Sequence, residues 1–152
     1  MSDLIALATP FPPHLVKKAP AGKYGDYVAH STVTERLLSV VGPFDFQVLR
    51  EVRGYAPEVS SGKRTWPARD NAIVGCLATL TCTVDGRVTT VTEVGTEDNP
   101  AMHNDAENLK NAASDALKRC AMRFGCGLHL WSNGDYFLHA QLVKDRDTRG
   151  DV

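Results

Sequence analysis

Apolar residues recur at helical spacing late in the chain, which predicts an amphipathic helix over about residues 105–124. Gly125 follows as a C-terminal stop. Three cations, Lys118, Arg119 and Arg123, lie toward the end of this helix. A surface helix whose last turn carries cations that suit its dipole fits the pattern equally well. The apolar face consists of Leu109, Ala112, Ala113, Ala116, Leu117, Cys120 and Phe124.

A second helix is predicted upstream. It begins with Ser31 or Thr32 as its N-cap, runs to about Val41 and ends at Gly42. Apolar positions then alternate over about residues 44–52, which predicts a strand.

Two longer strands are predicted in the middle of the chain, over about residues 72–84 and 87–94. The dipeptide Asp85-Gly86 between them favours a two-residue hairpin turn. A short strand is predicted within residues 128–138. The order helix, three antiparallel strands, helix indicates an α+β fold in which a three-stranded meander packs against a helix.

The two ends of the chain differ from the middle. Residues 1–20 are rich in alanine, proline and leucine, which predicts an extended or mobile segment. Charges alternate from Lys144 onward, which predicts a mobile charged tail over residues 141–152. A single domain is therefore expected over residues 21–140.

Composition narrows the class of protein. The chain has 152 residues, of which 43% are hydrophobic and 23% charged, as in ordinary globular proteins. No apolar run approaches the roughly 20 residues that span a bilayer, and no secretory signal is visible. A cytoplasmic protein without a membrane segment is the resulting expectation. The net charge is −1, so an anionic partner must be bound by a local basic patch.

The cysteines and histidines do not form a metal-ligand pattern. Cys76 and Cys82 are six positions apart, as are Cys120 and Cys126, whereas zinc ligand pairs are typically separated by two to four residues. We predict buried free thiols, with a metal site or a disulfide pair as the alternatives. The five histidines are scattered, without an HxxxH or HExxH motif. No metal is expected.

Neither a nucleotide site nor a catalytic site is indicated. The run SGKRT at residues 61–65 lacks the upstream glycine and the Ser/Thr after lysine that a Walker A motif needs. Glu51, Asp70, Glu93 and Glu97 could build a metal-dependent nuclease site, but their spacing does not select that over solvated carboxylates. We expect no cofactor and no enzymatic activity.

The helix run ASDALKRCAMRFG at residues 113–125 resembles a helix of the Rad52/Rad22 single-strand annealing family. Residues 27–46 resemble the family's N-terminal helix, and residues 93–96 resemble the end of its third strand. The similar segments follow in the family's order over about residues 17–138.

Two features depart from the family pattern. Met122 occupies the place of the family's second helix arginine, so that Arg123 directly precedes Phe124. The segment 54–71 is longer than in the better-known members. The first departure puts the role of Arg123 in doubt, and the second could add a surface of its own.

The resemblance implies a function as well as a fold. Members of the family bind single-stranded DNA and anneal complementary strands in recombination and repair, without a nucleotide cofactor. They form rings with DNA in a positively charged groove, and they have a second, outer DNA site. We therefore expect a homo-oligomeric ring that binds single-stranded DNA, with duplex DNA at the outer site. The short chain is typical of a phage or bacterial member; a phage-encoded one would act in the host cytoplasm.

By resemblance, Lys118 and Arg119 line the inner groove and contact phosphates. Two roles remain open for Arg123: a DNA contact, or an ion pair with Asp115 or Glu107 at a subunit contact. Asp115 itself is expected to be structural, because a carboxylate repels phosphates.

Basic residues near the N-terminus are also candidates. Lys17 falls where the family places another basic DNA contact, and Lys18 and Lys23 are nearby. Tyr27 stands at a family aromatic position beside the DNA. The alternatives are surface lysines of a flexible terminus and a packed tyrosine.

Residues 54–71 are predicted to form a polar loop in which Lys63, Arg64, Trp66 and Arg69 interleave cations with an aromatic ring. Such a pattern suits single-stranded nucleic acid, because stacking contributes about 1–3 kcal/mol per base. We hypothesise that this loop contributes to an outer DNA site. The alternative is a solvated connection with Trp66 packed on its own domain.

Three functions therefore remain open. The first is a DNA-annealing recombination protein, and the second is a passive single-stranded nucleic-acid-binding module. The third is a metal-dependent nuclease. Annealing without ATP or metal, binding without annealing, and magnesium-dependent cleavage distinguish them.

Overall fold

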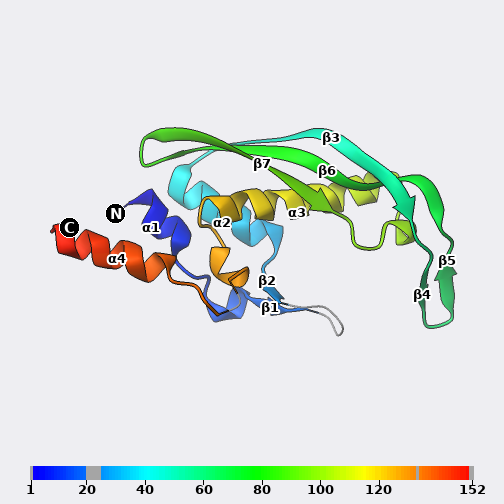
Figure 1. The fold of residues 1–152 in the computed structure, drawn as a ribbon, viewed down its shortest axis with the longest axis horizontal. Coiled ribbons are helices and arrows are strands. Elements are labelled where there is room, and N and C mark those ends of the chain that lie inside the picture. Colours follow the sequence, from blue (N-terminus) through cyan, green and yellow to red (C-terminus); the bar gives the residue numbers. More distant parts are fainter. Residues whose placement is uncertain (1, 20–24, 133, 151–152) are drawn as a thin grey trace. The chain divides into compact units, whose positions relative to one another are not determined.

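The computed structural model describes residues 2–19, 25–132 and 134–150 (Figure 1). These residues form two compact units. One unit contains the described residues of segments 1–44, 81–89 and 121–152, and the other contains Asp45–Leu80 and Thr90–Cys120. Along the chain, a helix is followed by the three strands of one antiparallel sheet and then by a second helix. This order confirms the predicted α+β fold.

The sheet consists of β3 (Asp45–Ala56), β6 (Arg69–Val84) and β7 (Arg87–Thr96), in the order β3-β6-β7. The predicted turn between β6 and β7 is confirmed: Asp85 and Gly86 have φ values of 49° and 80°. Two successive residues with positive φ give the hairpin a twist that matches its strands.

Helix α3 (Asp105–Arg123) confirms the predicted late helix and packs on the sheet through small side chains. Ala112 and Ala116 lie against Cys76 and Ala78 of β6, all four at 0% exposure. Strand β7 comes very close to α3 at Gly95, because a Cβ there would lie 2.0 Å from the Ala112 carbonyl oxygen. A larger residue would force the helix away from the strand.

The segment between the first two sheet strands is not the polar loop predicted for residues 54–71. Strand β3 continues to Ala56, β6 begins at Arg69, and a hairpin of β4 (Val59–Ser61) and β5 (Arg64–Trp66) lies between them (Figure 1). Val59 and Trp66 are paired and pack partly against a buried alanine cluster. This apolar anchor at the base of the hairpin explains why the polar segment is ordered. The cluster consists of Ala56, Ala72 and Ala101.

The other unit contains helix α2 (His30–Val41), which ends at Gly42 as predicted. Its start differs from the prediction: the N-cap is Ala29, and no side chain caps the helix. Buried Val33 and Leu37 fix the helix through its apolar face instead.

The N-terminal segment is more regular than the extended or mobile segment predicted for residues 1–20. It contains helix α1 (Asp3–Ala8), the 3-10 turn η1 (Pro13–Leu15) and strand β1 (Lys17–Lys18), which pairs with β2 (Asp26–Tyr27). Burial of Ile5 and Leu7 stabilises α1, and the prolines lie after its end.

The chain after α3 also differs from the prediction. The strand predicted within residues 128–138 is absent from the described part of that range, which contains the 3-10 turn η3 (Leu128–Leu130). Gly127 precedes it with φ 76°, which turns the chain instead of extending it. Helix α4 (Leu138–Arg149) replaces most of the predicted mobile tail, and it packs against α1.

The division into a segment 1–20, a domain 21–140 and a tail 141–152 stays a prediction.

A second 3-10 turn, η2 (Pro100–Met102), precedes α3. None of the described helices is both long and apolar enough to cross a membrane.

Candidate nucleic-acid interface

Helix α3 presents a stripe of Lys110, Ser114 and Lys118, each one turn from the next. Lys110 is exposed, Lys118 is half-buried, and the small Ser114 between them donates to the Lys110 carbonyl oxygen at 3.2 Å. The buried alanines hold the opposite side of the helix. The two lysines of the stripe therefore stand on a backbone that is fixed by packing.

Arg119 lies beside the stripe and is oriented by a carboxylate. Its Nε donates to Asp115 Oδ2 at 3.0 Å, and the same oxygen accepts from the Thr96 backbone N–H at 3.0 Å. The Arg119 side chain is 37% exposed. Asp115 thus has the structural role expected of it, joining the end of β7 to α3.

Arg123 is the last residue of α3 and is exposed. One residue of a helix corresponds to a rotation of about 100°, so Arg123 does not share the direction of the family's arginine at the position of Met122. Within this chain, Asp115 Oδ2 accepts from Arg119, and the ion pair of Arg123 with Asp115 or Glu107 at a subunit contact stays a prediction.

Three of the four N-terminal candidates meet on the two-stranded ribbon of β1 and β2. Lys17 pairs with Tyr27, and Lys18 pairs with Asp26. Directly opposed residues project to the same side of an antiparallel pair, and successive residues alternate. Lys17 therefore shares a face with Tyr27, which is 40% exposed, while Lys18 faces a carboxylate. Lys23 lies outside the described residues.

The β4-β5 hairpin carries its cations at the tip. Lys63 is exposed in the turn, and the Arg64 guanidinium lies over the Trp66 ring, 4.7 Å from its centroid. Trp66 is half-buried against the alanine cluster. Packing and the stacked arginine thus occupy much of the indole that was considered for base stacking.

Arg69 lies at the base of the hairpin and is half-buried. Its Nη2 donates to the carbonyl oxygens of Pro100 at 3.1 Å and His103 at 3.0 Å, and it contacts Asp105 Oδ1 at 3.4 Å. These bonds fasten the chain before α3 to the start of β6. The position is one of structural anchoring, unlike that of the tip residues.

Asp105, which sequence reasoning missed, connects this anchor to the sheet. Its carboxylate accepts from the Ile73 N–H at 3.2 Å and from Arg53 Nη1 at 3.3 Å. The hydrogen bond from Ile73, followed by the interactions with Arg53 and Arg69, lowers the pKa of Asp105 below its ordinary value. The one sequence signal for this role of Asp105 was the position of an acidic residue at the start of a helix.

A model of the Rad52/22 family of double-strand break repair proteins matches residues 51–148 of this chain. That match covers more than half of the chain. The chain belongs to the Rad52/Rad22 family. The matched range contains the α3 cations and the β4-β5 hairpin, whereas Lys17, Lys18 and Tyr27 lie outside it.

One relative is the single-stranded DNA-binding protein DdrA of Deinococcus deserti, which is 54% identical over 50 residues. The matched segment is 32% of this chain and 24% of that relative. The chain therefore matches about a quarter of DdrA's length.

For this member of the Rad52/Rad22 family, the cysteines are free and buried, as predicted. Burial raises the pKa of Cys82 to about 11 and that of Cys126 to about 12, which keeps both thiols protonated. No group of three or more potential metal ligands occurs among the described residues.

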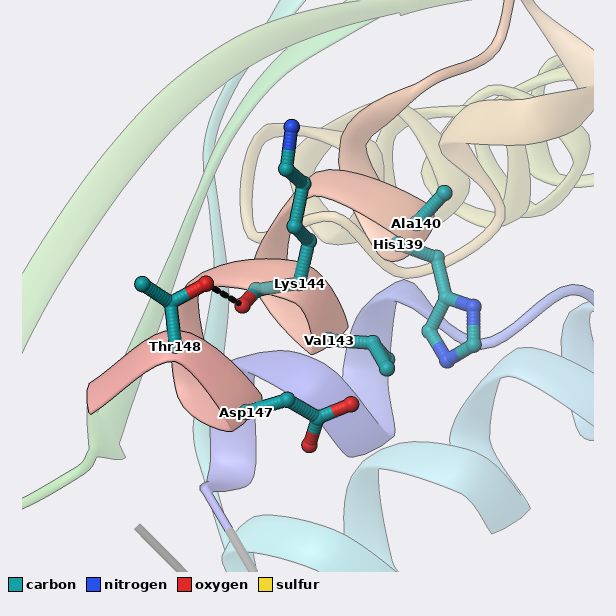
Figure 2. Close-up of a pocket in the computed structure, with 6 residues that line it drawn as sticks. All are labelled: His139, Ala140, Val143, Lys144, Asp147 and Thr148. Carbon is teal, nitrogen blue, oxygen red and sulfur yellow. Dashed lines mark hydrogen bonds between the residues drawn. The ribbon is translucent and has the colours of Figure 1, made fainter. Parts of the chain in front are cut away.

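A hollow on α4 has none of the predicted site residues in its lining. Figure 2 shows its six lining side chains along that helix, where Thr148 Oγ1 donates to the Lys144 carbonyl oxygen at 2.8 Å. A cation and a carboxylate occur together there, which does not favour a polyanion. The lining consists of His139, Ala140, Val143, Lys144, Asp147 and Thr148.

Proposed function

We propose that this protein binds single-stranded DNA and anneals complementary strands in recombination and repair, without a nucleotide cofactor and as a homo-oligomeric ring. The observation that carries the proposal is the cationic surface of α3, with Lys118 and Arg119 on a helix fixed by close packing against the sheet. The family and the relative DdrA support single-stranded DNA as the ligand.

The chemistry of annealing favours such a surface. Complementary strands must be held while their base edges remain available for pairing. Lysine and arginine bind phosphates without reading sequence, and they leave the bases exposed. A helix held by packing keeps these cations at a constant spacing, so that the bound strand is presented in an extended form.

Within the α3 surface we assign different roles to the two cations. Arg119 is pre-oriented by Asp115, so it supplies a phosphate contact of defined direction. Lys118 continues the stripe that begins at Lys110 and supplies a point charge. Arg123, rotated from the family position, is proposed as a peripheral contact.

The ribbon of β1 and β2 supplies a further set of contacts in this proposal. Lys17 and Tyr27 share one face, which allows a phosphate contact and a base-stacking contact by the same strand pair. Lys18 faces Asp26, which offsets its attraction for phosphate. We therefore propose a larger contribution from Lys17 than from Lys18. Lys23 remains a candidate from the sequence.

For an outer site we propose the tip of the β4-β5 hairpin, with duplex DNA as its ligand. Lys63 and Arg64 are exposed there, and phosphate contacts suffice for a duplex that is not read in sequence. The half-buried Trp66 and the bonded Arg69 support the tip and contribute less.

The net charge of the protomer and the edges of the sheet support the proposed ring. A protomer with a net charge of −1 attracts DNA better when several copies align their basic patches. Strands β3 and β7 are the two edges of the three-stranded sheet and can pair with neighbouring subunits. Light scattering at working concentration tests this proposal, and a clean monomer would contradict it.

The central test is annealing of complementary fluorescent oligonucleotides without ATP and without metal. Lys118→Ala is expected to slow annealing by roughly fivefold to tenfold, because one phosphate contact is lost. Lys144→Ala, the matched loss of an exposed lysine on α4, is expected to change the rate little. Binding without accelerated annealing would indicate a passive module, and magnesium-dependent cleavage would indicate a nuclease.

A further inference from the structure

A histidine holds the N-terminal segment in place. The Phe11 backbone N–H donates to His129 Nε2 at 3.4 Å, and the Phe11 and His129 rings pack with centroids 5.8 Å apart. Phe11 is only 5% exposed. Tyr136 packs on the same imidazole at 5.9 Å and donates its hydroxyl hydrogen to the Ala8 carbonyl oxygen. The chain just after α1 is therefore attached at a buried point.

Arg36 of α2 completes this attachment. Its Nη1 donates to the carbonyl oxygens of Ala6 at 3.2 Å and Thr9 at 2.7 Å, which lie at the end of α1. Its guanidinium also lies over the Phe11 ring, 4.5 Å from the centroid. A fixed positive charge thus stands close to the histidine. We call Arg36, His129 and Tyr136 the N-terminal clamp.

The hydrogen bond determines the protonation state of His129. Because Nε2 accepts from Phe11, the single proton of the neutral ring is on Nδ1. Nδ1 is buried and has no hydrogen-bond partner among the described residues. A second proton would make Nε2 a donor facing the Phe11 N–H, and it would add a positive charge beside Arg36.

We propose that His129 is a proton-sensitive positioning residue that docks the N-terminal segment when neutral and releases it when protonated. The segment leads within six residues from Phe11 to Lys17. Release would therefore withdraw Lys17 from a fixed position on the ribbon. This last step rests on the proposed DNA-binding function, whereas the release of the segment does not.

The direction of the pH dependence follows from the surroundings of His129. Burial, with a further effect of Arg36, lowers its pKa below the ordinary 6.5. The released histidine therefore takes up a proton more readily than the docked one, so that docking weakens as the pH falls below 6.5.

Tyr136, Cys126 and Asp85 keep their protonation states between pH 7.5 and pH 5. Burial raises the pKa of Tyr136 and raises that of Cys126 to about 12. At the other end of α1, desolvation opposes the ionisation of Asp85, but hydrogen bonds from Asp3, Ser2 and Leu4 lower its pKa overall. His129 is thus the group of this set that changes charge.

Hydrogen exchange with His129→Gln tests the release. Glutamine offers an acceptor near the position of Nε2 but does not titrate. In wild type, the protection factors of amides 5–16 are expected to fall about tenfold from pH 7.5 to pH 5, as one buried hydrogen bond is lost. They are expected to stay within about twofold in His129→Gln. The control His30→Gln removes an exposed histidine and should behave as wild type.

Two outcomes would overturn the proposal. The first is that the protection factors of wild type do not fall between pH 7.5 and pH 5, and the second is that they fall equally in His129→Gln. A measurement on the unmodified protein covers the case in which that variant does not fold. The NMR shifts of the His129 ring and the Phe11 amide should titrate with one shared midpoint, and different midpoints would contradict the clamp. Tyr136→Phe should lower protection at both pH values while preserving their ratio, and a ratio that changed would contradict the assignment to His129.

A DNA-binding measurement tests whether His129 positions Lys17. Anisotropy with single-stranded oligonucleotide gives the ratio of Kd between Lys17→Ala and wild type. This ratio should exceed one at pH 7.5, approach one at pH 5, and stay above one at both pH values in the His129→Gln background. A ratio of one at pH 7.5 would overturn the role of Lys17. If no variant binds DNA, the proposed function fails, while hydrogen exchange still decides the clamp.

Discussion

Helix α3 and the N-terminal segment both carry proposed DNA contacts, but different interactions hold them. Helix α3 has 19 residues and packs through a continuous face of small side chains. Helix α1 has six residues, too few for an isolated helix to be stable in water, and polar side chains at both ends hold it in addition to the buried Ile5 and Leu7. Asp85 accepts from the Asp3 and Leu4 N–H groups at its start, and Arg36 donates to carbonyl oxygens at its end.

This contrast indicates which of the proposed DNA contacts can respond to solution conditions. Cations on α3 move only if a close-packed core moves, so their arrangement is insensitive to mild changes of solution. The lysines of β1 depend on a few hydrogen bonds, one of them to a titratable ring. We therefore expect the α3 contacts to be constitutive and the β1 contacts to be conditional.

The largest effect is expected from Gly95→Val, which disrupts the packing of α3 against β7. Its Cβ would lie 2.0 Å from the Ala112 carbonyl oxygen and 2.5 Å from the Ala116 nitrogen. A loss of at least about 3 kcal/mol in the free energy of unfolding should follow, measured by urea denaturation. Gly54→Ala is the control, because its Cβ would meet only the Val74 side chain at 3.4 Å. Equal losses in both variants would contradict the close approach.

Arg36→Ala tests the N-terminal segment, because it removes the side chain that donates to the carbonyl oxygens at the end of α1. Charged hydrogen bonds contribute about 1.5–3 kcal/mol, so we expect a loss of about 2 kcal/mol in unfolding free energy. Limited proteolysis should show cleavage within residues 5–16 before cleavage in α3. Arg50→Ala, on exposed Arg50 of β3, should leave both readouts unchanged. Simultaneous cleavage in both regions would argue against separate attachment.

Asp105→Asn tests the start of α3 by pH. The folded pKa of Asp105 is lowered, so its ionised form stabilises the protein fully above the unfolded value of 3.8. This contribution is lost as the pH falls through the folded pKa. At pH 7 the variant should therefore melt at a lower temperature than wild type. The difference in melting temperature between the variant and wild type should narrow as the pH falls below 3.8. A difference that is independent of pH would refute this role of Asp105.

The smallest effect is expected on the salt dependence of DNA binding. Each phosphate contact on a single strand contributes about 0.7 to the slope of log K against log salt. Lys17→Ala should lower that slope by about this amount, whereas Lys18→Ala, opposite Asp26, should change it less. Fluorescence anisotropy across salt concentrations measures both slopes. A larger change in Lys18→Ala would reverse the assigned faces of the ribbon.

Sequence patterns predicted the elements that are long and periodic. The α3 helix, the end of α2 at Gly42 and the turn at Asp85-Gly86 all depend on residues close together in the chain. The α1 helix and the β4-β5 hairpin were missed, since their stability comes from partners distant in sequence. Arg69 illustrates the same limit for the site, because its three acceptors lie more than 30 positions later.

The fold class, the family and the cations of α3 could be predicted from the amino-acid sequence, because helical periodicity and a local motif are properties of neighbouring residues. The sequence did not show which cations are bound within the protein and which ones share a face; these came from the tertiary structure. The tertiary structure bound Arg69 to Asp105, placed Lys17 beside Tyr27 and brought His129 to Phe11. Such contacts depend on how distant segments pack, and packing is not encoded in the spacing of residues along the chain.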